Sequence, residues 1–145
     1  MNNRDQTLTQ IDELFHARSV AIAGLPRGMK TGKLFLMALL DQGFKGPIYP
    51  VNPGAGEIDG LKTYPSVADI PGPVDLVIVL VPHHHTLAVV RDCVAKGVKG
   101  IVLFTSGYLE TGTTEGARLQ DEILHTARAA DIRLIGPNGM GLYCP

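Results

Sequence analysis

Short apolar runs alternate with longer amphipathic stretches along the chain. The run after Asp75 is continuously apolar, which indicates a strand buried on both faces, as in a parallel sheet. Between the runs, apolar residues recur every three or four positions, the spacing of one helix face. The pattern predicts strands over residues 20–23, 47–51, 74–81, 98–104 and 132–135, and helices over residues 9–17, 31–42, 85–96 and 115–130. Residues 61–65 add a short extended piece, and residues 66–70 a single helical turn.

The regular alternation of strands and helices predicts an α/β fold. We expect a Rossmann-like, doubly wound parallel sheet of about five strands with helices on both faces. Ligands of such sheets bind beyond the carboxyl ends of the strands, where the strand order reverses. The loops that follow the strands are therefore the expected site: residues 24–33, 52–56, 82–85, 105–112 and 136–141.

Composition narrows the class of protein. A chain of 145 residues is most simply one domain, with residues 1–13 expected as a partly ordered leader. A net charge of −1 gives no general attraction to nucleic acid or to an anionic membrane. The amino terminus lacks the pattern of a signal peptide, and no apolar run is long enough to span a bilayer, so a cytoplasmic location is expected. Cys93 and Cys144 have no metal-ligand spacing, and Cys93 is expected to be buried and reduced.

The loop after the first strand contains three glycines together with Arg27, Lys30 and Lys33. A strand, a glycine-rich turn and a helix start aim backbone N–H groups and a positive dipole end at whatever lies above the strand. An anionic, phosphate-bearing ligand fits this arrangement, and a tight connection without a ligand is the alternative. The loop is not a Walker A motif, because Leu34 stands where Ser or Thr is needed, and Pro26 breaks the pattern G-x-G-x-x-G.

The end of the second strand bears on the choice of nucleotide. A nicotinamide dehydrogenase would have an acidic residue there to bind the ribose hydroxyls, but this chain has Asn52. An NAD(P)-binding oxidoreductase domain is therefore disfavoured, although asparagine can still hydrogen-bond a ribose or a purine.

The other polar segments do not predict a metal site or a catalytic residue. The adjacent histidines His83, His84 and His85 cannot all converge on one ion, so they are expected to be exposed at a helix start, and no metal site is predicted. Ser106 lies outside a G-x-S-x-G motif, and no catalytic residue is assigned. Residues 110–115 are expected to form a mobile polar loop. Residues 136–141 contain three glycines and a proline, which allow the backbone to approach something closely.

Six segments together resemble one family. They are SVAIAG (19–24), GFKGPIYPVNP (43–53), GLKTYPS (60–66), PVDLVI (73–78), KGVKG (96–100) and RLIGPN (133–138). They resemble the N-terminal CoA-binding domain of NDP-forming acyl-CoA synthetases, relatives of the succinyl-CoA synthetase α subunit. The resemblance extends from about Leu14 to the end of the chain.

The resemblance implies a site for coenzyme A. The CoA phosphates would be faced by Gly24, Leu25, Pro26 and Arg27, and the nucleotide would be bordered by Asn52 and Pro53. The adenine and pantetheine would be lined by Val81, Pro82 and His83. The thiol arm would be flanked by Thr105, Ser106, Gly107, Pro137 and Asn138.

The chain departs from the family in two places. Gly54 replaces a frequent lysine, so a positive contact would have to come from Arg27 or Lys30. Gly139 and Met140 replace the usual residues near the thiol.

The resemblance also implies partners. In the family a histidine of the next domain is transiently phosphorylated, and nucleotide binds in an ATP-grasp domain or subunit. None of the chain's histidines matches that residue. The chain would then be one part of an acid–thiol ligase, holding CoA for attack on an acyl phosphate, and would not be catalytically complete alone. A stand-alone regulatory CoA-binding protein is the alternative, and a homodimer stays open. The acyl substrate and the choice of ATP or GTP cannot be inferred from these residues.

Overall fold

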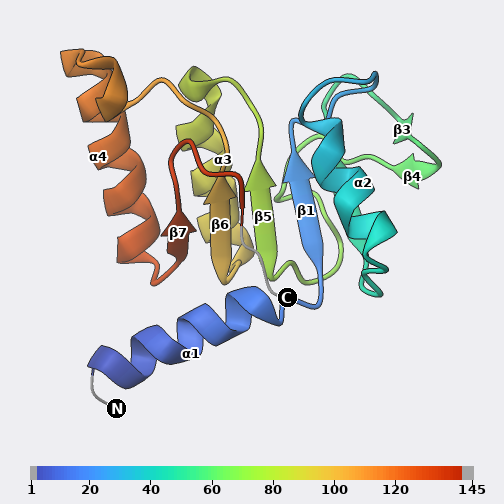
Figure 1. Cartoon of the computed structure of the whole chain (residues 1–145), viewed down its shortest axis with the longest axis horizontal. Helices are drawn as coiled ribbons and strands as arrows, with labels where there is room; N and C mark the ends of the chain where they lie inside the picture. Colours follow the sequence, from blue (N-terminus) through green and yellow to red (C-terminus); the bar gives the residue numbers. More distant parts are fainter. Residues whose placement is uncertain (1–2, 142–145) are drawn as a thin grey trace.

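The computed structural model describes residues 3–141, and it contains a five-stranded, all-parallel sheet. The strands are β1 (Val20–Ala23), β2 (Ile48–Val51), β5 (Leu76–Val79), β6 (Gly100–Leu103) and β7 (Arg133–Ile135). Their order is β2-β1-β5-β6-β7 (Figure 1). The predicted doubly wound α/β fold is confirmed. The strand order reverses between β1 and β5, which marks the crevice where such folds bind ligands.

Four α-helices of the described part of the chain surround the sheet, three of them on its faces and one across an end. They are α1 (Asn3–Phe15), α2 (Lys33–Asp41), α3 (His83–Lys96) and α4 (Thr114–Ala129). Val20 and Ile22 of β1 pack with Leu36 of α2, whereas Ala21 and Ala23 belong to the core that α3 and α4 complete. This alternation is the period of two that a strand imposes on its side chains. Both faces of β1 are therefore buried, as its apolar run predicts.

Helix α1 lies across the amino ends of the strands (Figure 1). It begins at Asn3, six residues before the predicted start, so most of the predicted leader (1–13) falls within it. The Leu14 side chain fills the space left by Gly100, where a Cβ would lie 1.8 Å from Leu14 Cδ2. Gln10 Nε2 donates to Asp131 Oδ1 at 2.8 Å. These contacts close the amino edge of the sheet and leave the carboxyl edge to the loops.

Helix boundaries differ from the prediction where local backbone geometry decides them. Helix α3 starts two residues early, at His83, because extended Pro82 stands at its N-cap position. Helix α2 starts two residues late, at Lys33. The predicted strand over 74–81 is longer than β5 at both ends, because Val74 and Asp75 precede β5 and Leu80 and Val81 belong to the following loop.

A small hairpin follows β2. Its strands are β3 (Glu57–Ile58) and β4 (Leu61–Lys62), joined by Asp59 and Gly60 with φ of 51° and 77°. Positive φ at both turn residues is the geometry of a tight hairpin turn. The predicted extended piece (61–65) begins with β4, and Tyr64 then forms a parallel bridge to Val51. A short 3₁₀ turn, η1 (Leu109–Thr111), precedes α4.

Candidate functional site

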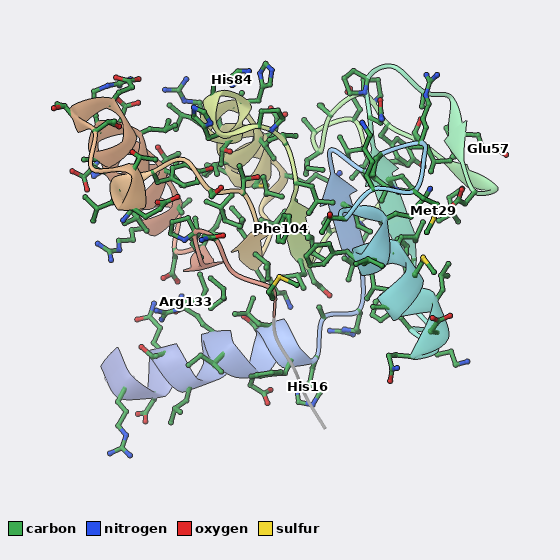
Figure 2. All side chains as sticks on the ribbon, turned by 45° about the horizontal axis from the view of Figure 1, so that its top comes forward. His16, Met29, Glu57, His84, Phe104 and Arg133 are labelled. Atoms are coloured by element: carbon green, nitrogen blue, oxygen red, sulfur yellow. The ribbon has the colours of Figure 1, made fainter. Side chains whose placement is uncertain are left out.

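The predicted site residues all lie in loops or helix starts at the carboxyl edge of the sheet, at the top of Figure 1. Figure 2 labels His84 at this edge, on α3, and Arg133 beside α1 at the opposite edge. The loops after β1 and β5 flank the point where the strand order reverses. The candidate site therefore lies where the fold rule places it.

The β1 and β5 loops are packed against each other. Gly24 has a φ of 88°, and a Cβ on it would lie 2.9 Å from both the backbone nitrogen and Cγ1 of Val81. A Cβ on Gly32 would lie 2.9 Å from Leu80 Cδ1 and 3.3 Å from Pro26 Cδ. Glycine is required at position 24 because of both its φ and its contacts. The close packing brings the start of α2 against the crevice.

The starts of α2 and α3 have no side-chain cap. Gly32 and Pro82 occupy the two N-cap positions, and neither makes a side-chain hydrogen bond to the first turn. Helix α4 differs, because Thr113 Oγ1 accepts a hydrogen bond from Gly116 N at 3.1 Å. A helix start without a side-chain cap presents its positive dipole end to a ligand, although at α2 the Lys33 and Leu34 N–H groups already donate to the Lys30 and Thr31 carbonyl oxygens. Two such starts flank the β1/β5 crevice.

Asn52 fixes the loop after β1. Its Nδ2 donates to the carbonyl oxygen of Leu25 at 2.9 Å, and its Oδ1 accepts from Gly54 N at 2.9 Å. An aspartate could not make the first of these hydrogen bonds, because a carboxylate has no donor. The structure thus gives a physical reason for asparagine here: both ends of its amide hold loops together.

Arg27 is exposed and reaches toward the loop after β2. A Cβ placed on Gly54 would lie 3.8 Å from Nη2 of Arg27. The guanidinium therefore lies beside the position where the resembling family often has lysine. Lys30, the other candidate for a positive contact, is also exposed.

Lys33 does not belong with Arg27 and Lys30 as a free cation of the loop. Its side chain is only 4% exposed, and Nζ lies 2.7 Å from Asp59 Oδ2 in the hairpin turn. The grouping of Lys33 with the exposed loop cations was wrong, because the hairpin buries its charge. Asp59 was missed as its partner, and the adjacent Asp-Gly pair was the available signal of a turn.

The loop after β6 contacts both α3 and the β5 loop. Thr105 Oγ1 donates to the Val81 carbonyl oxygen at 2.6 Å. A Cβ on Gly107 would lie 2.8 Å from Nδ1 of His83, so the imidazole covers this glycine. Ser106 between them is exposed. The predicted residues of these two loops are therefore neighbours.

Glu110 lies within the predicted loop (105–112) but was not named as a site residue. Its Oε1 accepts from Gly107 N at 2.6 Å, and its Oε2 accepts from Tyr108 N at 3.1 Å. The Gly107 hydrogen bond is the main reason that the pKa of Glu110 lies below its usual range, and His83 adds to the effect. The first residues of the predicted polar loop (110–115) are thus tied into a turn by a carboxylate.

Tyr108 anchors the same loop in the core. Its side chain is fully buried, and its hydroxyl lies 2.8 Å from Thr86 Oγ1 of α3. Burial raises the pKa of Tyr108, although the hydrogen bond to Thr86 lowers it. The hydroxyl pair satisfies two polar groups that would otherwise be buried without partners.

The loop after β7 completes the edge. Asn138 N donates to the Thr105 carbonyl oxygen at 3.1 Å, which brings Pro137 and Asn138 beside the β6 loop. A Cβ on Gly136 would lie 2.4 Å from the Leu103 carbonyl oxygen. The close approach predicted from the glycines is therefore made, at Gly136, to the backbone of the neighbouring strand.

The remaining candidate chemistry is limited. His83, His84 and His85 are exposed in the first turn of α3, and within residues 3–141 no His, Cys, Asp and Glu side chains are grouped to hold a metal ion. Cys93 is free and buried, and burial raises its pKa to about 12, so its thiol stays protonated at neutral pH. Cys144 lies outside the described residues. None of the helices in the described part is long and apolar enough to cross a membrane.

Comparison with known proteins identifies the family. The family model described as "CoA binding domain" matches residues 18–145, so the chain belongs to this family. It is 41% identical over 139 residues to an ADP-forming acetate–CoA ligase II of Archaeoglobus fulgidus. That match covers 95% of this chain but 20% of the ligase. The chain thus spans about a fifth of the length of this relative.

Solved structures give the same result. An acetyl-coenzyme A synthetase 1 of Candidatus Korarchaeum cryptofilum, in complex with phosphate and ADP, is 40% identical with a TM-score of 0.79. The match covers 87% of this chain and 27% of that one. A conserved hypothetical protein of Pyrococcus furiosus is 30% identical with a TM-score of 0.63, and it is covered over 93% of its length. The fold therefore occurs both within large synthetases and as nearly the whole of a small chain.

Proposed function

We propose that the carboxyl edge holds coenzyme A for an NDP-forming acyl-CoA ligase. The observation that carries the proposal is the pair of helix starts without side-chain caps, α2 and α3, beside the β1/β5 crevice. The 3′-phosphate and pyrophosphate of CoA carry several negative charges, which helix starts and a nearby guanidinium stabilise. Arg27 supplies that guanidinium beside Gly54.

The loops divide the cofactor among them. Residues 24–27 take the phosphates, and Asn52 positions this loop while Pro53 borders the nucleotide. Residues 81–83 line the adenine and pantetheine. The β6 and β7 loops flank the thiol arm through Thr105, Ser106, Gly107, Pro137 and Asn138. The direct contacts between neighbouring loops support one continuous site.

The role in the reaction is to present the thiol. The sulfur forms a bond to the carbonyl carbon of an acyl phosphate, phosphate leaves, and the thiol proton is released. Partner domains that carry a phosphohistidine and an ATP-grasp nucleotide site make the acyl phosphate. The similarity to an ADP-forming acetate–CoA ligase over a fifth of its length supports this division. The described chain holds CoA and leaves the transfer of phosphate to its partners.

Isothermal titration calorimetry of CoA against the purified chain tests the proposal. We expect saturable heat of binding, and Arg27→Ala to weaken the affinity by about 1.5–3 kcal/mol, the range for a hydrogen bond to a charged group. Arg128→Ala is the matched control, because Arg128 lies in the last turn of α4 and is exposed there. Absence of heat and of a thermal shift at millimolar CoA would rule the proposal out. Equal affinities of the Arg27→Ala variant and the native chain would show that Arg27 does not contact the phosphates.

A stand-alone regulatory CoA-binding protein is the second candidate. The Pyrococcus furiosus protein covered over 93% of its length supports it. Mixing the chain with a candidate ligase partner, acid, ATP and CoA discriminates the two: thioester formation that requires both proteins favours the ligase. Competition with NADH addresses the oxidoreductase alternative. We expect no displacement of CoA by NADH, because the Asn52 amide is already bonded to Leu25 and Gly54.

A further inference from the structure

Helix α2 is apolar on all sides. Every residue between its terminal Lys33 and Asp41 is apolar, yet only Lys33 and Leu36 are buried. A helix with this composition is normally covered all round. Helix α4 is different, because it exposes charged residues such as Glu115 and Arg118, which pair with each other. The outer face of α2 therefore has the composition of a buried surface.

The exposed residues of α2 form a ridge. Leu34, Met37 and Leu40 are 53%, 40% and 52% exposed, and their spacing of three places them along one side of the helix. We call these three residues the α2 ridge. Beside it lies a hollow of about 170 Å³, lined by Thr31, Leu34, Phe35, Ala38 and Met140. A ridge next to a hollow is the surface with which one helix packs on another.

Figure 1 shows α2 and α3 on opposite faces of the sheet, and no other helix of residues 3–141 lies over α2. In Figure 2, Met29 is labelled near the amino end of α2. Met29 and Met140 are each 76% exposed and extend the apolar surface beyond the ridge. Methionine side chains adapt to a facing surface, as is common at interfaces.

The charges at the two ends of α2 favour a second copy of this chain as the partner of this face. Exposed Lys30 lies just before α2, joined to it by a turn in which Lys33 N donates to Lys30 O at 2.8 Å, and exposed Asp41 ends the helix. A second copy of α2, antiparallel about a two-fold axis at Met37, would bring Leu34 opposite Leu40. Asp41 would then face the first turn of the other helix, close to Lys30. The helix dipoles also oppose in this arrangement, whereas a parallel pair would place like charges together.

We propose that the α2 ridge is a two-fold, antiparallel interface between two copies of this chain. The interface buries the apolar face of α2 and forms the Lys30–Asp41 pair twice. It does not depend on CoA binding, so failure of one proposal leaves the other standing.

Sedimentation equilibrium over a range of micromolar concentrations tests the interface. We expect a dimer for the native chain and a monomer for Met37→Glu, because two carboxylates would meet at the axis. Leu109→Glu is the matched control: Leu109 is 59% exposed in η1, which packs on α4, and this variant should remain dimeric. Thermal unfolding and CoA titration check that both variants are folded. A native monomer at every concentration, or a dimeric Met37→Glu, overturns the proposal and leaves the face to a different polypeptide.

Cross-linking tests the register. In a Cys144→Ser background, a mild oxidant should join Met37→Cys across the axis into a covalent dimer, whereas Leu109→Cys should stay uncross-linked. The charge pair is tested by Asp41→Lys, which should weaken the dimer, and by Lys30→Asp with Asp41→Lys, which should restore it. A dimer in which Met37→Cys fails to cross-link, or one indifferent to the Asp41 charge, contradicts the antiparallel arrangement.

Discussion

Lys33 shows how burial changes the role of a charged residue at the candidate site. Its place in a glycine-rich loop favours contact with phosphate, yet its ammonium group lies beneath the hairpin, 2.7 Å from Asp59. The partner is far along the chain, so loop composition alone could not reveal it. Arg27, six residues earlier and exposed, keeps its charge available. The two cations therefore have different functions: Lys33 holds the hairpin, and Arg27 faces the ligand in our proposal.

Removing the negative partner should destabilise the fold. Asp59→Asn leaves the buried ammonium of Lys33 without its counter-charge, and we expect the free energy of unfolding to fall by roughly 1–3 kcal/mol. The value is below that of a fully buried pair because Asp59 is half exposed. Asparagine tolerates the φ of 51° at this position, so backbone strain does not contribute. Urea denaturation of the purified variants measures the difference.

The control is a double-mutant cycle with Lys33→Met. Replacing the buried charge by an apolar side chain of similar length should be close to neutral. In that background Asp59→Asn should cost less than about 0.5 kcal/mol. An equal cost of Asp59→Asn with and without Lys33 would mean that the ion pair does not stabilise the hairpin.

At the scale of elements, the β1-to-α2 connection depends on Gly24. A side chain there would be strained by the φ of 88° and would collide with Val81 of the neighbouring loop. Gly24→Ala should lower the free energy of unfolding by about 2 kcal/mol, which corresponds to roughly 4–8 °C in Tm, and should also weaken CoA binding. Gly28→Ala is the matched control, because nothing lies within 4 Å of a Cβ at Gly28. Similar thermal stability of both variants would contradict the packing of the two loops.

The elements could be predicted where periodic patterns specify them. All five sheet strands coincide with largely apolar segments, and α4 coincides with apolar residues at clear helical spacing. The start of α3 could not be read from spacing, because Pro82 and the backbone decide it. The two-residue strands β3 and β4 are too short to show a period. The early start of α1 accompanies contacts with distant residues, such as Gln10 with Asp131.

The common position of the candidate loops was also predictable, because a parallel sheet places the loops that follow its strands at one edge. The contacts that each side chain makes were harder to predict. The side chains of Asn52 and Glu110 form hydrogen bonds with backbone groups of the loops, and neither interaction follows from residue type. The same sequence features that indicate a ligand site therefore also build it, and only the contacts separate these roles.

At the scale of the molecule, the two edges of the sheet are covered in different ways. Helix α1 closes the amino edge through Leu14 and Gln10, while the loops of the carboxyl edge are joined to one another. Binding at the carboxyl edge should therefore leave α1 unchanged. It should order the loops that contact the ligand, because a ligand that binds the folded state suppresses local opening near its site.

Hydrogen exchange measured by mass spectrometry tests this separation. With saturating CoA, we expect slower exchange in residues 24–32, 81–86 and 104–108, which contain the β1, β5 and β6 loops and the start of α3. Residues 3–15 should exchange at the same rate with and without CoA, and Arg27→Ala at the same CoA concentration should show weaker loop protection. Protection centred on α1 would place the ligand at the amino edge instead. Because both edges border the same sheet, a uniform slowing would indicate global stabilisation alone, whereas protection confined to the loops locates the site.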